Sequence, residues 1–309
     1  MQRAYENSNP AKNGHQEPHI PIEIVDDDSS ANDSACDLAA TATRVPVLLN
    51  ILNDCILETV FNAAVQSLKA LVKDKTKSQE GAVLNQYTIE CLLSTLHKIC
   101  SPSSSMRDTS HGGFLYNDVC QILRSTLQFH RPSLGGRLHI VIPLLKQLMA
   151  CFFTPSKVMG RNKGQARRTF QHPPWLHQES KPLLAKHAPP FVRLITLLCN
   201  PPQSTLPGYR AGSDQPRLTD AVREARLHVS EFVPTLVHAY VHFQLHGVLG
   251  AGVKDALTPA IYAMFDVMDM AAPEDARIIA LGASMGKAEL ALLRKDHGEW
   301  KRFGRWRGG

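Results

Sequence analysis

The stretch VKDALTPAIYAMFDVMD, residues 253–269, shows the clearest structural pattern in this chain of 309 residues. Its apolar side chains recur at intervals of three and four residues: Ala256, Leu257, Ala260, Ile261, Met264, Phe265 and Met268. In an α-helix this spacing gathers large apolar side chains on one face. The stretch therefore predicts a helix that buries one side against the rest of the domain.

Similar spacing recurs along most of the chain. Further helices are predicted over about 46–73, 83–100, 114–129, 135–153, 190–199, 217–232, 234–249 and from 273 onward, with a kink at Pro143. No strand-like segments alternate with these helices, and no fixed repeat length is visible. The sequence therefore predicts an all-α fold of stacked antiparallel helical hairpins, an α-solenoid-like bundle.

Composition divides the chain into an arm and a domain. Residues 1–44 hold eight Asp and Glu side chains among many Asn, Ser, Pro and Gly residues, which predicts an acidic disordered arm. Residues 45–309 are expected to form one all-helical domain with irregular loops at 154–187 and 200–215. The first loop is strongly basic, because it holds Lys157, Arg161, Lys163, Arg167, Arg168, Lys181 and Lys186 against Glu179 alone.

The overall composition is typical of a soluble intracellular protein. Hydrophobic residues make up 43% of the chain and charged residues 20%. No apolar segment follows Met1, so we expect no secretory signal, and the most apolar run, 138–153, is too short to span a bilayer. The seven cysteines form no CxxC pair, and we interpret them as small buried side chains in a reducing compartment.

One motif suggests an enzyme. Residues 282–286, GASMG, match the G-x-S-x-G pattern of serine hydrolases, with Ser284 as the nucleophile. The candidate acid and histidine downstream, Asp296 and His297, are adjacent and cannot form the required line of side chains. The sequence therefore favours a joint between two helices made of small residues, and we predict no catalytic residues.

Three histidines recur every four residues at His238, His242 and His246. The first two have the spacing of a metal-binding pair on one helical face. Positions eight residues apart, however, are about 12 Å apart along a helix, too far to share one ion. A solvated or interface face of histidines is the better interpretation, and neither a metal nor another cofactor is predicted.

The chain closes with cations and aromatic rings. Arg294, Lys295, Lys301, Arg302, Arg305 and Arg307 lie close to Trp300, Phe303 and Trp306. Because exposed rings at a chain end favour aggregation, we expect these three to dock on the domain or on a partner, and we call them the C-terminal latch. The alternative is direct RNA binding, in which Lys301, Arg302 and Arg305 and the basic loop contact phosphates.

Five segments carry a resemblance to a known family. Residues 256–267, ALTPAIYAMFDV, and the closing WKRFGRW, 300–306, resemble the C-terminal domain of the nucleolar pre-ribosomal-RNA-processing family called unhealthy ribosome biogenesis protein 2. The segments GFLYNDVC at 113–120, and FHR and GRLH at 129–131 and 136–139, are also similar to this family. The likeness covers most of residues 110–155 and 189–309.

The resemblance implies a non-enzymatic assembly factor of the nucleus and nucleolus. Members of that family act in early maturation of the large ribosomal subunit, within pre-60S particles, and in pre-ribosomal-RNA processing. It implies partners among other assembly factors, including a large helical-repeat scaffold and a DEAD-box helicase, and contact with the pre-ribosomal particle. Contact with pre-ribosomal RNA itself is a further expectation, and no membrane association is implied.

Overall fold

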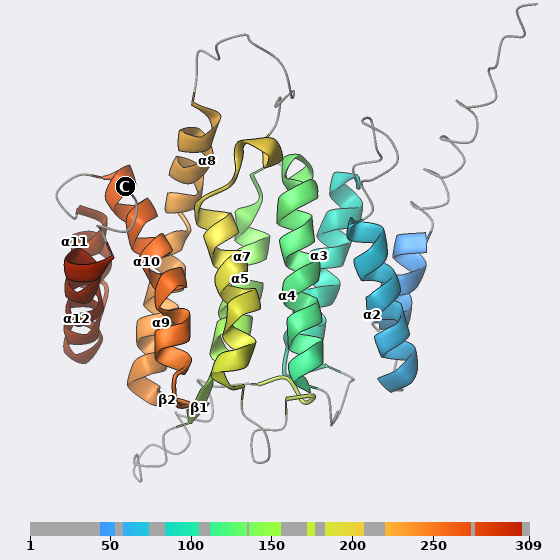
Figure 1. The fold of residues 1–309 in the computed structure, drawn as a ribbon, viewed down its shortest axis with the longest axis horizontal. Coiled ribbons are helices and arrows are strands. Elements are labelled where there is room, and N and C mark those ends of the chain that lie inside the picture. The colour runs from blue at the N-terminus through green and yellow to red at the C-terminus, as the bar shows by residue number, and fades with distance from the viewer. Residues whose placement is uncertain are drawn as a thin grey trace, which may run out of the picture. The chain divides into compact units, whose positions relative to one another are not determined.

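The fold consists of helices, as the sequence predicts (Figure 1). The computed structural model describes residues 44–52, 58–73, 84–104, 112–134, 136–155, 172–176, 183–206, 220–272 and 276–304. The predicted acidic arm lies outside these residues, apart from Arg44, which begins a helical segment that runs to Leu52. In the described part of the chain no helix is long and apolar enough to cross a membrane.

The helices account for most of the described part of the chain. Their bounds are α2 (Glu58–Lys73), α3 (Gln86–Cys100), α4 (Gly112–Phe129), α5 (Leu138–Ala150), α7 (Ala188–Cys199), α8 (Ala221–Ser230), α9 (Val233–His246), α10 (Val253–Ala271), α11 (Ala276–Ala283) and α12 (Lys287–Phe303). Single 3-10 turns lie at Arg131–Leu134, Ala185–His187 and Gln203–Thr205. The helix predicted over 114–129 ends at Phe129 as expected, and a 3-10 turn begins at Arg131.

The main helices form two layers. One layer places α2, α4, α7 and α10 side by side, and the other places α3, α5, α9 and α12 side by side. Because consecutive main helices alternate between the layers, each pair is a hairpin stacked on the next, as Figure 1 shows from α2 to α12. A single cluster of buried apolar side chains runs from Val45 to Trp300 and joins the hairpins. The prediction of stacked hairpins is therefore confirmed.

Two predicted helices are shorter than expected. The helix predicted over 135–153 ends at Ala150, and the one over 234–249 ends at His246. The residues beyond them form two short strands, β1 (Phe153–Pro155) and β2 (Gly247–Leu249), which pair antiparallel with Phe153 opposite Leu249. Helices α5 and α9 are neighbours, so their ends bring these segments together and their backbone groups bond to each other. This pairing is non-local, and helical spacing cannot reveal it.

Part of the predicted basic loop packs on the domain. Trp175 is fully buried, and its indole nitrogen donates a 2.7 Å hydrogen bond to the carbonyl of Ile99 at the end of α3. A Cβ atom on Gly112 would lie 2.7 Å from the carbonyl oxygen of Trp175, so only glycine permits this close approach. The segment 172–176 is thereby fixed against α3 and α4, although the sequence predicted an irregular loop throughout 154–187.

Candidate functional site

The last helix, α12, is held on the domain by Trp300. This side chain is 1% exposed, and its ring stacks at 5.2 Å on His297 and lies 5.9 Å from the ring of Phe265 on α10. Its indole nitrogen also donates a 2.8 Å hydrogen bond to Asp266 Oδ1. Burial raises the pKa of Asp266, while the bond from Trp300 opposes that rise. Trp300 therefore joins α12 to α10 by both packing and a polar contact.

The other members of the C-terminal latch are placed differently. Phe303 is 63% exposed, so its ring does not dock on the domain, and of the two expected positions only contact with a partner stays a prediction. Trp306 and Arg305 lie outside the described residues. Gly304 is buried, and a Cβ atom there would lie 2.9 Å from the ring of Tyr262 and 3.0 Å from the carbonyl oxygen of Trp300. The glycine of the closing Phe-Gly pair thus lets the chain end pass close to α10.

All three carboxylates of α12 point toward neighbouring helices. Glu289 Oε1 lies 2.8 Å from His242 Nδ1, and this bond lowers the pKa of the Glu289 carboxyl. Asp296 accepts a 2.9 Å hydrogen bond from the side chain of Gln244, and burial raises its pKa. Lys254 lies 3.6 Å from Asp296 and 3.7 Å from Glu299. The negative charges of α12 are therefore engaged within the domain.

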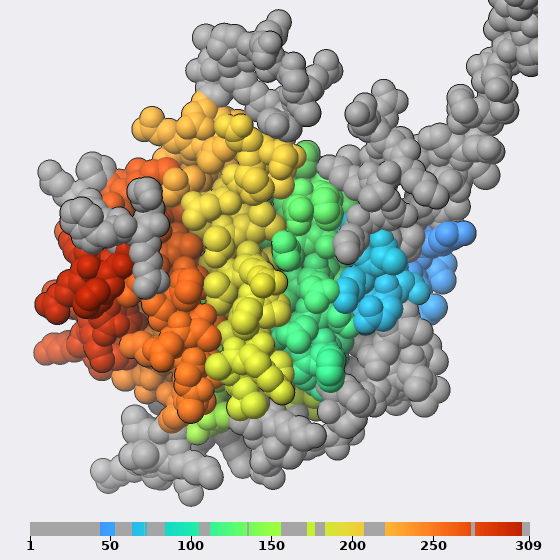
Figure 2. All heavy atoms as spheres, viewed as in Figure 1, coloured from blue at the N-terminus to red at the C-terminus, as the bar shows by residue number. Residues whose placement is uncertain are grey.

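The cations of α12 lie on its outer side. Lys287, Arg294, Lys295, Lys301 and Arg302 are all exposed, and we call this set the α12 basic face. At 100° per residue these positions fall within an arc of about 120°, away from the side that carries Trp300, Glu289 and Asp296, while the partly exposed Glu299 lies beside the arc. Figures 1 and 2 show α12 at one edge of the row of helices, where its atoms are coloured dark red. Sequence reasoning singled out Lys301 and Arg302 but could not show that the carboxylates turn inward.

The remaining predicted RNA contacts cannot be placed relative to this face. Lys157, Arg161, Lys163, Arg167 and Arg168 lie outside the described residues. Their part in a joint surface with α12 therefore stays a prediction.

Ser284 lies in the connection between α11 and α12. Its hydroxyl donates a 2.7 Å hydrogen bond to the carbonyl of Leu281, one turn earlier in the chain. Residues 277–281 are helical, so they do not form the strand that precedes a hydrolase nucleophile. The interpretation of GASMG as a joint between two helices is confirmed.

The three histidines line the side of α9 that faces α12. The rings of His238 and His242 are parallel with centroids 6.2 Å apart, and those of His242 and His246 are 4.6 Å apart. The carboxylate of Glu289 meets the middle ring from the other helix. Among the described residues no group of three His, Cys, Asp or Glu side chains is arranged to hold a metal ion. The contact with α12 makes this an interface face of histidines.

The described cysteines behave as the sequence predicts. Cys100, Cys120, Cys151 and Cys199 are buried with free thiols, and Cys91 is half-buried. Burial raises the pKa of Cys151 and Cys199 to about 12, so both thiols stay protonated and unreactive at neutral pH.

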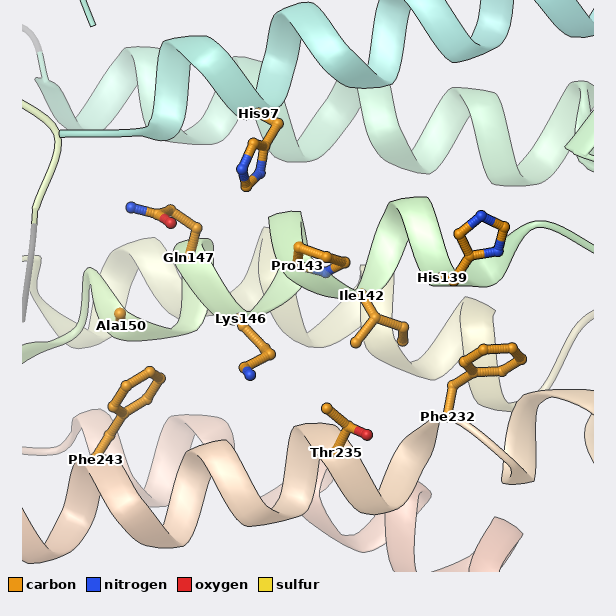
Figure 3. A pocket seen from close by; sticks show the side chains of 10 residues that line it. All are labelled: His97, His139, Ile142, Pro143, Lys146, Gln147, Ala150, Phe232, Thr235 and Phe243. Atoms are coloured by element: carbon orange, nitrogen blue, oxygen red, sulfur yellow. The ribbon is translucent and has the colours of Figure 1, made fainter. Parts of the chain in front are cut away.

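A groove of about 530 Å³ crosses the layer of α3, α5 and α9 (Figure 3). Its lining combines basic and aromatic side chains from these helices and from the residue before α9: His97, His139, Lys146, Phe232 and Phe243. Pro143 lies in its floor, where α5 presents its outer side between the other two helices. Among the residues that the structure describes, no carboxylate lines this groove. The sequence analysis proposed none of these residues as a site, because they come together only from three separate helices.

Comparison with known proteins identifies the family. The Urb2/Npa2 family matches residues 62–309, which is most of the chain and spans every helix from α3 to α12. No curated protein and no solved structure matches the chain. The match includes Trp300, Gly304 and the α12 basic face. The chain belongs to the Urb2/Npa2 family and has a role in ribosome biogenesis.

Proposed function

We propose that this protein is a non-enzymatic helical scaffold that helps to assemble the large ribosomal subunit and to process its precursor RNA. The observation that carries the proposal is the family match over an unbroken stack of helical hairpins. Stacked hairpins expose long faces of side chains, and such surfaces commonly bind other macromolecules. The two motifs that suggested enzymatic or metal chemistry have structural explanations, in the turn at Ser284 and at the contact between α9 and α12.

The partners follow from the same proposal. We expect the protein to act in the nucleolus on pre-60S particles, together with a larger helical-repeat scaffold and a DEAD-box helicase. Its C-terminal hairpin, α11 and α12, would be held in place by Trp300, so that the faces offered to these partners keep a fixed geometry. Phe303, which the domain leaves 63% exposed, is then available to a partner protein.

The test is to isolate the tagged full chain from cells and to identify its associated proteins and RNA. We expect co-sedimentation with pre-60S particles and recovery of large-subunit assembly factors, including a DEAD-box helicase. Depletion of the protein is expected to cause large-subunit precursor RNA to accumulate while small-subunit precursors mature.

Two variants make this test specific. Trp300→Ala, which removes the contact between α12 and α10, is expected to reduce recovery of the partners, whereas Arg124→Gln, an exposed change on α4, is expected to leave it unchanged. A chain that sediments apart from pre-ribosomal particles, or whose depletion leaves precursor RNA levels unchanged, would overturn the proposal.

A further inference from the structure

We propose that the α12 basic face is a binding surface for the phosphate backbone of RNA. The inference rests on the proposed function in one respect only, that pre-ribosomal particles supply the RNA. The binding itself is a property of the isolated chain and can be tested without any other assembly factor.

The first step of the argument is the separation of charge across α12. Within the described residues the helix holds five cations and three carboxylates, which sequence alone presents as a nearly balanced mixture. The structure turns Glu289, Asp296 and Glu299 toward His242, Gln244 and Lys254. Glu289 and Asp296 are thereby engaged on the inner side, while Glu299, whose side chain is 41% exposed, lies at the edge of the α12 basic face, so the five cations outnumber the one carboxylate beside them. The outer side is left strongly positive.

The second step is the length and shape of this surface. From Lys287 to Arg302 the face extends about 22 Å along the helix axis. Arg294 and Lys301 follow one edge of it, and Lys295 and Arg302 follow the other, one heptad apart in each case. Between the two rows lie Ala291 and Gly298, and around the position of a Cβ at Gly298 there is no atom within 4 Å. Two rows of cations beside a low strip of small residues can follow an extended chain of phosphates.

The third step concerns the class of partner. Surfaces that bind proteins are enriched in aromatic side chains at their centre and depleted in lysine. The α12 basic face consists of three lysines and two arginines, the residues between its two rows are Ala291 and Gly298, and the exposed ring of Phe303 lies at its C-terminal end. In the described part of the chain Arg294, Lys295 and Arg302 make no ion pair, so their charges remain available to a ligand. A polyanion with regularly spaced charges fits this surface better than a protein does. Because the family has a role in ribosome biogenesis, RNA is the polyanion that we expect this surface to meet.

The experiment measures binding of the purified full chain to a fluorescein-labelled single-stranded RNA of about 20 nucleotides by fluorescence anisotropy, over a series of KCl concentrations. The test variant combines Arg294→Gln, Lys295→Gln, Lys301→Gln and Arg302→Gln. The control variant combines four exposed cations from other helices: Arg44→Gln, Arg124→Gln, Arg193→Gln and Arg223→Gln. Both variants lose four positive charges, so the comparison separates the α12 basic face from the net charge of the protein.

We expect the wild type to bind RNA with an affinity that falls steeply as salt rises. Each phosphate contact contributes roughly 0.7 to the slope of log affinity against log salt on a single strand, so the test variant should lose about 3 from this slope. In 0.1 M salt each lost contact corresponds to about a fivefold weaker affinity. The control variant should retain most of the affinity and most of the salt slope of the wild type. Equal circular dichroism spectra and melting temperatures of the three proteins would show that the changes act on binding.

Three results would overturn the proposal. The wild type could fail to bind RNA, the test variant could keep its affinity and salt slope, or the two variants could lose affinity equally. None of these results bears on sedimentation with pre-ribosomal particles, so a failure here is distinct from a failure of the scaffold function. Ultraviolet crosslinking of the wild-type complex, followed by mass spectrometry, gives an independent readout, with crosslinks expected in residues 287–302.

Discussion

Replacing Trp300 by alanine is expected to release α12 from the domain. The side chain is 1% exposed, packs against Phe265 and His297, and donates a hydrogen bond to Asp266. Loss of a buried tryptophan side chain costs about 3–5 kcal/mol in the free energy of unfolding. The half-buried Asp266 would also lose its donor, at a cost of about 1–3 kcal/mol that overlaps with the first. We expect a total loss of about 4 kcal/mol.

The assay is urea unfolding followed by circular dichroism, together with hydrogen exchange of the amides of α10 and α12. Trp300→Phe separates the two contributions, since it keeps an aromatic ring and removes the donor, and we expect a loss of about 2 kcal/mol. Because the bond from Trp300 lowers the pKa of Asp266, this variant should also raise that pKa further. Phe303→Ala is the control, and its exposed ring should contribute less than about 0.5 kcal/mol. The reasoning fails if Trp300→Ala and Phe303→Ala unfold at the same urea concentration with unchanged exchange in α12.

Three further predictions follow from single contacts. Gly304→Ala should lower the free energy of unfolding by about 1–3 kcal/mol, because its Cβ would overlap two neighbours. Gly298→Ala should raise the free energy of unfolding by about 0.5–1 kcal/mol, because its Cβ meets open space in a helix. Urea midpoints of the two variants that move in the same direction would contradict this. The pKa of Glu289 is lowered in the folded state, so its stabilising contribution is present above its ordinary pKa and is lost as the pH falls through the lower, folded value. Glu289→Gln should therefore cost about 1 kcal/mol at pH 7 and progressively less as the pH falls through the folded pKa of Glu289, and an equal difference in urea midpoint at every pH would argue against this bond. Trp175→Phe removes the hydrogen-bond donor to the end of α3 and should lower the free energy of unfolding by about 1–3 kcal/mol. The control Leu184→Ala changes a side chain that is 47% exposed and should lower it by less than about 0.5 kcal/mol. Thermal unfolding compares the two variants, and matching melting temperatures would show that the Trp175 bond does not contribute.

The helices were predictable because the spacing of apolar residues in the local sequence shows which side of a helix is buried. Residues three and four positions apart share a face, so the apolar positions of α10 indicate both the helix and its buried side before any neighbour is known. The end of α4 is also written in local sequence, because Pro132 disfavours the helical conformation in the residue before it. Local spacing was wrong at Phe153 and Val248, where two segments nearly a hundred residues apart form a strand pair, because the partner of a strand is chosen by the packing of other elements.

Sequence by itself determined the all-helical class, the joint at Ser284 and the concentration of cations near the chain end. Only the tertiary structure decided which of the α12 charges face water. Asp296 and Glu289 turn inward because α9 and α10 present partners there, and the cations remain outside because burying a charge without a partner costs too much free energy. The burial of Trp175 could not be predicted from local sequence either, since its indole nitrogen bonds to a carbonyl at the end of α3, 76 residues away. Contacts of this range are set by the stacking of hairpins, and that stacking is a property of the whole domain.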